Sequence, residues 1–121
     1  MVWSFVAVST QVRASSGDVT PTLPTGWAAD DIHVCLIASR DNVASTMPAG
    51  WTAIDAGTNN SVSHRFTAFW RRAVGGDVDP LVTHTAGGRI VASIAGWRGL
   101  SIGAQPDATG TTKVNASSVT I

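Results

Sequence analysis

The most informative segment of the chain reads Ile32-His33-Val34-Cys35-Leu36-Ile37-Ala38-Ser39. It is rich in β-branched and other apolar residues, which are favoured in strands. In an extended strand, even-numbered and odd-numbered side chains point to opposite faces. Both faces of this segment are largely apolar near its middle. The pattern therefore predicts a central strand that is covered on both sides.

Similar extended segments recur along the chain, separated by turns rich in Gly, Pro, Asn and Asp. Arg89–Arg98 is predicted to be a second central strand, and Gly57-Thr58-Asn59-Asn60 is predicted to be the turn of a hairpin. No segment has the 3.6-residue period of a convincing helix. Further strands are expected at 2–10, 18–23, 51–56, 61–73, 81–85 and 113–121. About eight short strands at this spacing predict an all-β fold, an antiparallel β-sandwich or barrel with little or no helix.

The composition indicates one small β-rich domain spanning residues 1–121. Of the 121 residues, 44% are hydrophobic and 13% are charged, and the formal net charge is zero. The charged share is roughly half of the usual value of about 25%. Because eight basic residues are balanced by eight acidic ones, binding to nucleic acid or to an anionic membrane is not expected. The apolar start of the chain lacks a basic region and is expected to form a strand, not a signal peptide, and no segment reaches transmembrane length.

One turn motif occurs twice, as Pro24-Thr25-Gly26-Trp27 and as Pro48-Ala49-Gly50-Trp51. Two copies are too few for a repeat architecture. Proline restricts φ, and glycine supplies a backbone angle that other residues avoid. We expect the Trp of each copy to cover the edge of the core at the start of the next strand.

Metal binding is weakly indicated at most. His33 and Cys35 are two strand positions apart and could face one ion, but a buried thiol beside a histidine is the preferred interpretation. Cys35 is the only cysteine, so no internal disulfide can form. The pairs Asp30-Asp31 and Asp41-Asn42 and the run Asp77-Val78-Asp79 offer oxygen ligands for Ca²⁺, yet none matches a known calcium loop and Asp caps turns for local reasons. No metal or cofactor is predicted.

No arrangement of residues indicates catalysis. A Gly-x-Ser-x-Gly elbow is absent, and His84 lies in an ordinary Thr-His-Thr strand. Every Asp lies in a turn-like context, so a pair of catalytic carboxylates is not evident. A small hydrolase would have to depend on His84 and a nearby Asp. The protein is predicted not to be an enzyme, and no catalytic residue is assigned.

Five tryptophans in a chain of this size raise the possibility of carbohydrate binding, because sugar rings stack on exposed indole faces. Trp3, Trp51 and Trp70 lie in or beside apolar strands and are predicted to be core residues. Trp27 and Trp97 lie nearer loops. Together with Arg98, they are the predicted contacts for a glycan or a protein partner.

The order of the motifs resembles a domain of virion proteins in tailed bacteriophages and prophages, over roughly residues 2–100. The resemblance rests on Pro24, Gly26 and Asp31 before the apolar strand, on Pro48-Ala49-Gly50-Trp51, on Phe69-Trp70-Arg71-Arg72-Ala73 followed by Gly76-Asp77, and on Trp97-Arg98-Gly99. It implies a jelly-roll-like β-sandwich. Such domains usually continue for several more strands, so this chain is expected to be a minimal version, to be completed by a strand from a partner, or to be truncated at its C-terminus.

The resemblance and the low charge together predict a non-catalytic structural protein located in the virion. It would be a capsid decoration (cement) protein or a component of the tail fibre or tail tip. Its expected partners are other capsid or tail proteins and further copies of itself, as a trimer or another symmetric oligomer. The alternative function is a carbohydrate-binding module that recognises glycans on the host surface.

Overall fold

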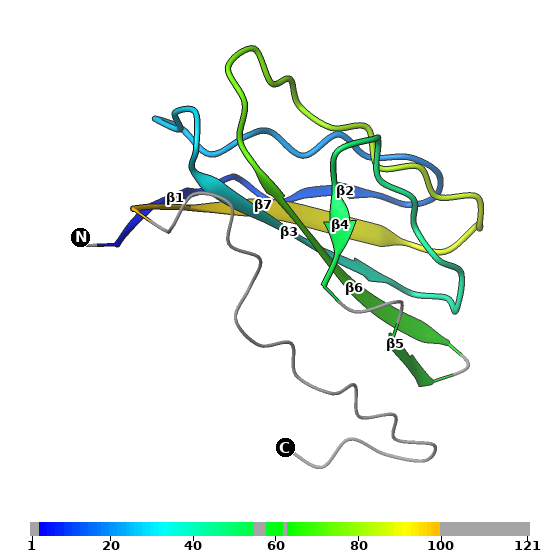
Figure 1. The fold of residues 1–121 in the computed structure, drawn as a ribbon. Helices are drawn as coiled ribbons and strands as arrows, with labels where there is room; N and C mark the ends of the chain where they lie inside the picture. Colours follow the sequence, from blue (N-terminus) through cyan, green and yellow to red (C-terminus); the bar gives the residue numbers. More distant parts are fainter. Residues whose placement is uncertain (1–2, 55–57, 62, 100–121) are drawn as a thin grey trace.

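The computed structural model describes residues 3–54, 58–61 and 63–99, with the backbone alone for residues 58–61. Seven strands form one antiparallel sheet, and the described ranges contain no helix, which confirms the all-β prediction (Figure 1). None of the described residues therefore belongs to a helix that could cross a membrane. The strands are β1 (Ser4–Val8), β2 (Val12–Ala14), β3 (Ile32–Ser39), β4 (Thr52–Ala53), β5 (Thr58–Ser61), β6 (His64–Arg72) and β7 (Ile90–Arg98).

Strand β3 lies at the centre of the sheet, whose order is β1-β7-β3-β6-β4. β3 is antiparallel to both neighbours along its full length, so that Cys35 pairs with Ile94 of β7 and with Phe69 of β6. The short strand β2 pairs with β7, and β5 pairs with β6. The prediction that Ile32–Ser39 is a central strand is therefore confirmed to the residue.

One face of the sheet, here called the inner face, carries the core. Its side chains come from alternate positions of β3, β7 and β6 and pack against three long loop segments, 15–31, 40–51 and 73–89 (Figure 1). Backbone hydrogen bonds tie these loops together at two isolated bridges, Val19 with Val82 and Thr46 with Thr83. The buried core cluster consists of Val19, Cys35, Ile37, Val82, Ile90, Ala92 and Ile94.

The opposite face, here called the outer face, carries the intervening side chains. No described loop covers its middle, and Leu36 at the centre of β3 is 41% exposed. The expectation that β3 is covered on both sides is therefore wrong for the part of the chain that the structure describes. Strand pairing places the following residues on the outer face: Phe5, Val8, Val34, Leu36, Ala38, Phe66, Ala68, Trp70, Val91, Ser93, Ala95 and Trp97.

Three predictions about local structure are wrong. Thr58 and Asn59, expected in a turn, belong to strand β5, because pairing with Phe66 and Arg65 satisfies their backbone groups. The expected strands 18–23 and 81–85 shrink to the two isolated bridges. Two tryptophans expected in the core lie outside it. Trp3 is 64% exposed, because it precedes β1 at the end of the sheet, and Trp70 lies half-buried on the outer face, because it pairs with Val34. The strand expected at 113–121 lies outside the described residues.

Both glycines of the repeated turn motif adopt the predicted backbone angle, but only the second tryptophan, Trp51, lies at the start of a strand as expected. Gly26 and Gly50 have φ angles of 81° and 93°, in the left-handed region that favours glycine. Trp51 follows directly, precedes β4 and packs against the core cluster. The guanidinium of Arg71 lies 5.8 Å from the centre of the Trp51 ring, which adds a cation–π contact to the burial of this edge.

Candidate functional site

The predicted contact residues Trp27 and Trp97 lie on different faces of the sheet. The Trp27 ring meets the inner-face residue His33 edge-on, with centroids 5.6 Å apart. The Trp97 ring lies on the outer face and meets Phe5 at 5.9 Å. Both indoles are half-buried. The two rings therefore do not form a single stacking platform for a sugar.

Arg98, the third predicted contact residue, is held by the buried carboxylate of Asp31. Its Nε and Nη2 donate to Asp31 Oδ1 and Oδ2 at 2.8 and 2.7 Å, and Nη2 also donates to the Gly26 carbonyl. The hydrogen bonds from Arg98 lower the pKa of Asp31 against the opposing effect of burial. Ala28 N–H donates to the same carboxylate at 2.8 Å. This cluster fixes the Gly26 turn against the end of β7, so Arg98 has a structural role.

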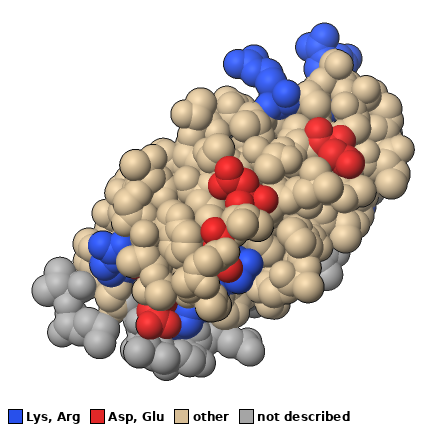
Figure 2. All heavy atoms as spheres, turned by 90° about the horizontal axis from the view of Figure 1, so that it is seen from above, with Lys and Arg blue, Asp and Glu red and all other residues tan. Residues whose placement is uncertain are grey.

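Two other loop carboxylates also have hydrogen-bond partners, and one of them lies within its own turn, as expected for turn residues. Asp77 accepts from Arg71 at 2.7 Å and from the Val74 N–H, and Asp79 accepts from the Leu23 N–H. Figure 2, which looks onto the loop layer, shows the Asp side chains spread across this face. Among the described residues, no three His, Cys, Asp or Glu side chains converge in a way that could hold a metal ion.

His33 and Cys35 are both fully buried on the inner face. Burial raises the pKa of the Cys35 thiol to about 12, so the reactive thiolate is not formed near neutral pH. Burial also lowers the pKa of His33, and Asp31 and Asp77 oppose this effect only in part. Neither ring nitrogen of His33 has a hydrogen-bond partner among the described residues. His33 is therefore a neutral core residue that resists protonation.

The structure brings together one group that the sequence did not link, namely Ser45, His84 and Asp41. His84 Nδ1 lies 3.1 Å from Ser45 Oγ, and Nε2 lies 3.0 Å from Asp41 Oδ2. Because an ionised carboxylate can only accept, Nε2 donates to Asp41 and the neutral ring can accept the Ser45 hydroxyl proton at Nδ1. Burial opposes ionisation of Asp41, but the hydrogen bonds from His84, Val43 and Gly88 outweigh it and lower the pKa of Asp41.

This Ser–His–Asp group contains the residue types of a hydrolase triad, but neither its ring-nitrogen contacts nor its accessibility match one. In the serine hydrolase template, the serine uses Nε2 and the carboxylate uses Nδ1, the reverse of the contacts here. Ser45 and His84 are buried, and Ser45 lines neither of the two cavities on the outer side of the sheet. The group instead joins the loop after β3 to the 82–85 segment, and Asp18 adds a hydrogen bond to the His84 N–H. We assign it a structural role.

The outer face is the most unusual surface of the molecule. Phe5, Leu36 and Phe66 are 55%, 41% and 43% exposed, and half-buried apolar residues fill the space between them. The face is as long as the nine residues of β7, about 30 Å, and as wide as four strands, about 20 Å. Its outline therefore covers about 600 Å². The largest apolar patch on a typical soluble monomer measures about 300–600 Å² and is often functional, so this face lies at the upper end of that range. The sequence already contained the alternating apolar residues, but not the information that one set of them lacks a covering layer.

Comparisons of the chain with protein-family models, with curated proteins and with solved structures found no match. We therefore infer the function from the exposed apolar residues of the outer face.

Proposed function

We propose that the protein is a non-catalytic structural component of a bacteriophage virion that acts through protein–protein contacts. The observation that carries the proposal is the exposed apolar outer face. Low charge supports it, since interface centres are depleted of charged residues and rich in aromatic ones. The resemblance to phage virion domains suggests where the protein acts. It would be a capsid decoration protein or a component of the tail.

The partner on the outer face is a second copy of this chain. Twofold pairing brings the same patch of each subunit together, so an apolar patch without acidic residues is complementary to itself. If each copy buried its outline of about 600 Å², the two would bury about 1,200 Å² together, at the lower end of the range for specific interfaces. A twofold axis perpendicular to the strands would also keep the arginines at one end of the face away from those of the other copy. Further contacts between such dimers could build larger symmetric oligomers.

Mass measurement by light scattering over a range of concentrations tests the proposed contact. The native chain is expected to associate, and Leu36→Asp is expected to be monomeric because a carboxylate would be buried at the centre of the interface. Val78→Asp is the matched control, since Val78 is 78% exposed and lies in a loop away from the outer face. A native chain that stays monomeric at high concentration would overturn the contact, and would leave residues 100–121 or another protein as the occupant of the face.

The virion location has a separate test. Phage particles would be purified from cultures of the source organism and their proteins quantified by mass spectrometry. We expect the chain in a fixed copy number per particle, retained through a density gradient. Particles that lack the chain, with full stability and complete appendages, would contradict the proposal.

Recognition of host glycans stays the alternative prediction. Because Trp27 and Trp97 lie on different faces, a glycan could stack on only one of them. A glycan array with the native chain, Trp27→Ala and Trp97→Ala distinguishes this function from the structural one. Binding that one substitution abolishes would support the alternative.

A further inference from the structure

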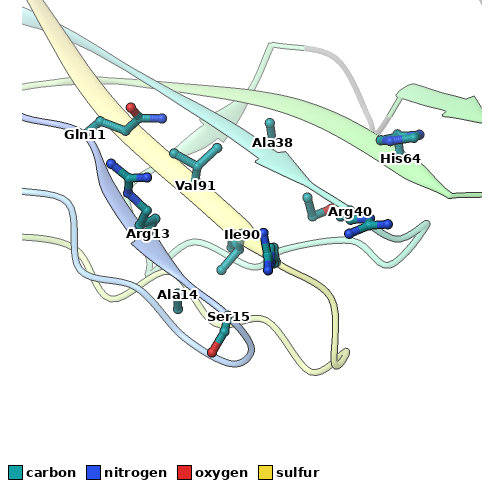
Figure 3. A pocket seen from close by; sticks show the side chains of 11 residues that line it. Gln11, Arg13, Ala14, Ser15, Ala38, Arg40, His64, Ile90 and Val91 are labelled. Carbon is teal, nitrogen blue, oxygen red and sulfur yellow. The ribbon is translucent and has the colours of Figure 1, made fainter.

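A cavity of about 610 Å³ opens at one end of the sheet, where β3 ends and β6 and β7 begin. The antiparallel pairing of these strands brings together residues that are far apart in the sequence. Backbone pairing of Arg13 with Val91 places β2 at the side of the same cavity. Figure 3 shows the lining side chains, with Gln11, Arg13 and Val91 on one side and Arg40 and His64 on the other.

Positive charge dominates this cavity. Its lining includes the three arginines Arg13, Arg40 and Arg89, and it includes no acidic residue. Within the described residues, none of these three arginines takes part in an ion pair. The adjacent carboxylate of Asp41 is directed to His84 and to the Val43 N–H instead.

All three arginines are solvent-exposed, so water screens part of their mutual repulsion, but no described carboxylate offsets it. The Arg40 N–H donates to the Arg89 carbonyl at 2.8 Å, so the two arginines face each other across one backbone hydrogen bond. Like charges placed directly opposite each other destabilise paired strands. Two arginines elsewhere are paired with carboxylates, Arg71 with Asp77 and Arg98 with Asp31. The three arginines at the cavity have no carboxylate partner among the described residues.

We propose that this cavity binds a small anion that carries at least two carboxylate or phosphate groups. Guanidinium groups recognise both kinds of oxyanion through paired hydrogen bonds. Gln11 and Ser15 supply further polar contacts at the rim, and Ala38 and Val91 supply apolar contacts for the carbon skeleton of the ligand. The volume is within the range of about 300–1,000 Å³ that is typical of small-molecule sites.

The charge is too local for a nucleic acid. A nucleic-acid surface needs a basic stripe along several turns of backbone, whereas this chain has zero formal net charge and gathers three arginines around one cavity. A compact ligand with a charge of −2 or −3 matches the three guanidinium groups.

The test measures thermal unfolding and calorimetric binding of the full chain with pyrophosphate, citrate and inorganic phosphate. Sodium chloride at matched ionic strength controls for general screening. We expect pyrophosphate or citrate to raise the melting temperature more than inorganic phosphate, and chloride to have the smallest effect. The ranking of pyrophosphate against citrate distinguishes a phosphate ligand from a carboxylate ligand.

Arg89→Gln and Arg40→Gln are each expected to weaken binding about tenfold, the effect of losing one charge-assisted hydrogen bond. Both variants should also melt at a higher temperature than the native chain at low salt, because the repulsion is relieved. This second readout shows that they fold. Arg72→Gln, at the opposite end of β6, is the matched control and should bind as the native chain does. Equal effects of all anions at matched ionic strength, or native binding by both cavity variants, would overturn the proposal.

Discussion

The inner and outer faces of the sheet are made of the same strands and of similar residues, but they have different environments. On β3, Ile37 points to the inner face and is 1% exposed, whereas its neighbour Leu36 points to the outer face and is 41% exposed. The difference comes from the three loop segments that cover the inner face. An apolar face is thus a core where a second layer covers it and a candidate interface where no described segment does.

The sharpest test of this difference compares Ile37→Ala with Leu36→Ala. Ile37→Ala leaves a cavity in the core cluster and is expected to lower the free energy of unfolding by about 3 kcal/mol. Leu36→Ala removes a half-exposed side chain and should lower it by less than about 1 kcal/mol in dilute solution. Urea denaturation followed by tryptophan fluorescence measures both. Equal losses in dilute solution would mean that the outer face is covered within a single chain.

A second test removes the buried carboxylate that anchors the loop layer to β7. Asp31→Ala deletes the two hydrogen bonds from Arg98 and the bond from Ala28, and is expected to lower the free energy of unfolding by about 2 kcal/mol. Because the pKa of Asp31 is lowered on folding, its contribution is present at neutral pH and is lost as the pH falls below about 4 through the folded-state pKa. Asp79→Ala, at an exposed loop carboxylate, is the control and should cost less.

A third test uses the buried histidine of the inner face. Because burial lowers the pKa of His33, the unfolded chain binds a proton at a higher pH than the folded chain does. Stability should therefore fall as the pH drops below about 6.5, by at most about 1.4 kcal/mol for each pH unit. Asp31, Asp77 and Arg71 are the charged groups that influence this titration.

In His33→Leu, the fall in the free energy of unfolding that comes from protonating this residue should disappear. In His64→Leu, the same fall should still be observed, because His33 is unchanged and His64 is exposed. Denaturation curves at pH 7, 6 and 5 provide the measurement. An unchanged slope in His33→Leu would contradict a neutral, buried role for this histidine.

The smallest expected effect concerns the buried Ser–His–Asp group of the loop layer. Ser45→Ala removes the hydrogen bond to His84 Nδ1 and is expected to lower the free energy of unfolding by about 1 kcal/mol. Turnover of ester substrates is expected to be absent both before and after the substitution. Esterase activity that disappears in Ser45→Ala would replace the structural role with a catalytic one.

The alternation of apolar residues was enough to predict strands at Ile32–Ser39 and, within one residue, at Ile90–Arg98. Strand periodicity is a local property, so it can be read without knowledge of the partner strands. Thr58 and Asn59 were misassigned because pairing with β6 overrides the local turn preference of Gly57-Thr58-Asn59-Asn60. Trp3 was misassigned because a large apolar side chain is typical of the core. Whether such a side chain is buried depends on the segments that pack next to it.

By itself, the sequence determined the extended backbone, the two-residue alternation and the glycine turns, since each follows from the preferences of a few neighbouring residues. The tertiary structure alone decided which of the two apolar faces became the core. It also decided that Ser45, His84 and Asp41 meet, and that Arg13, Arg40 and Arg89 gather without a carboxylate. These outcomes depend on strand order and on loop packing, which join residues that lie tens of positions apart in the chain.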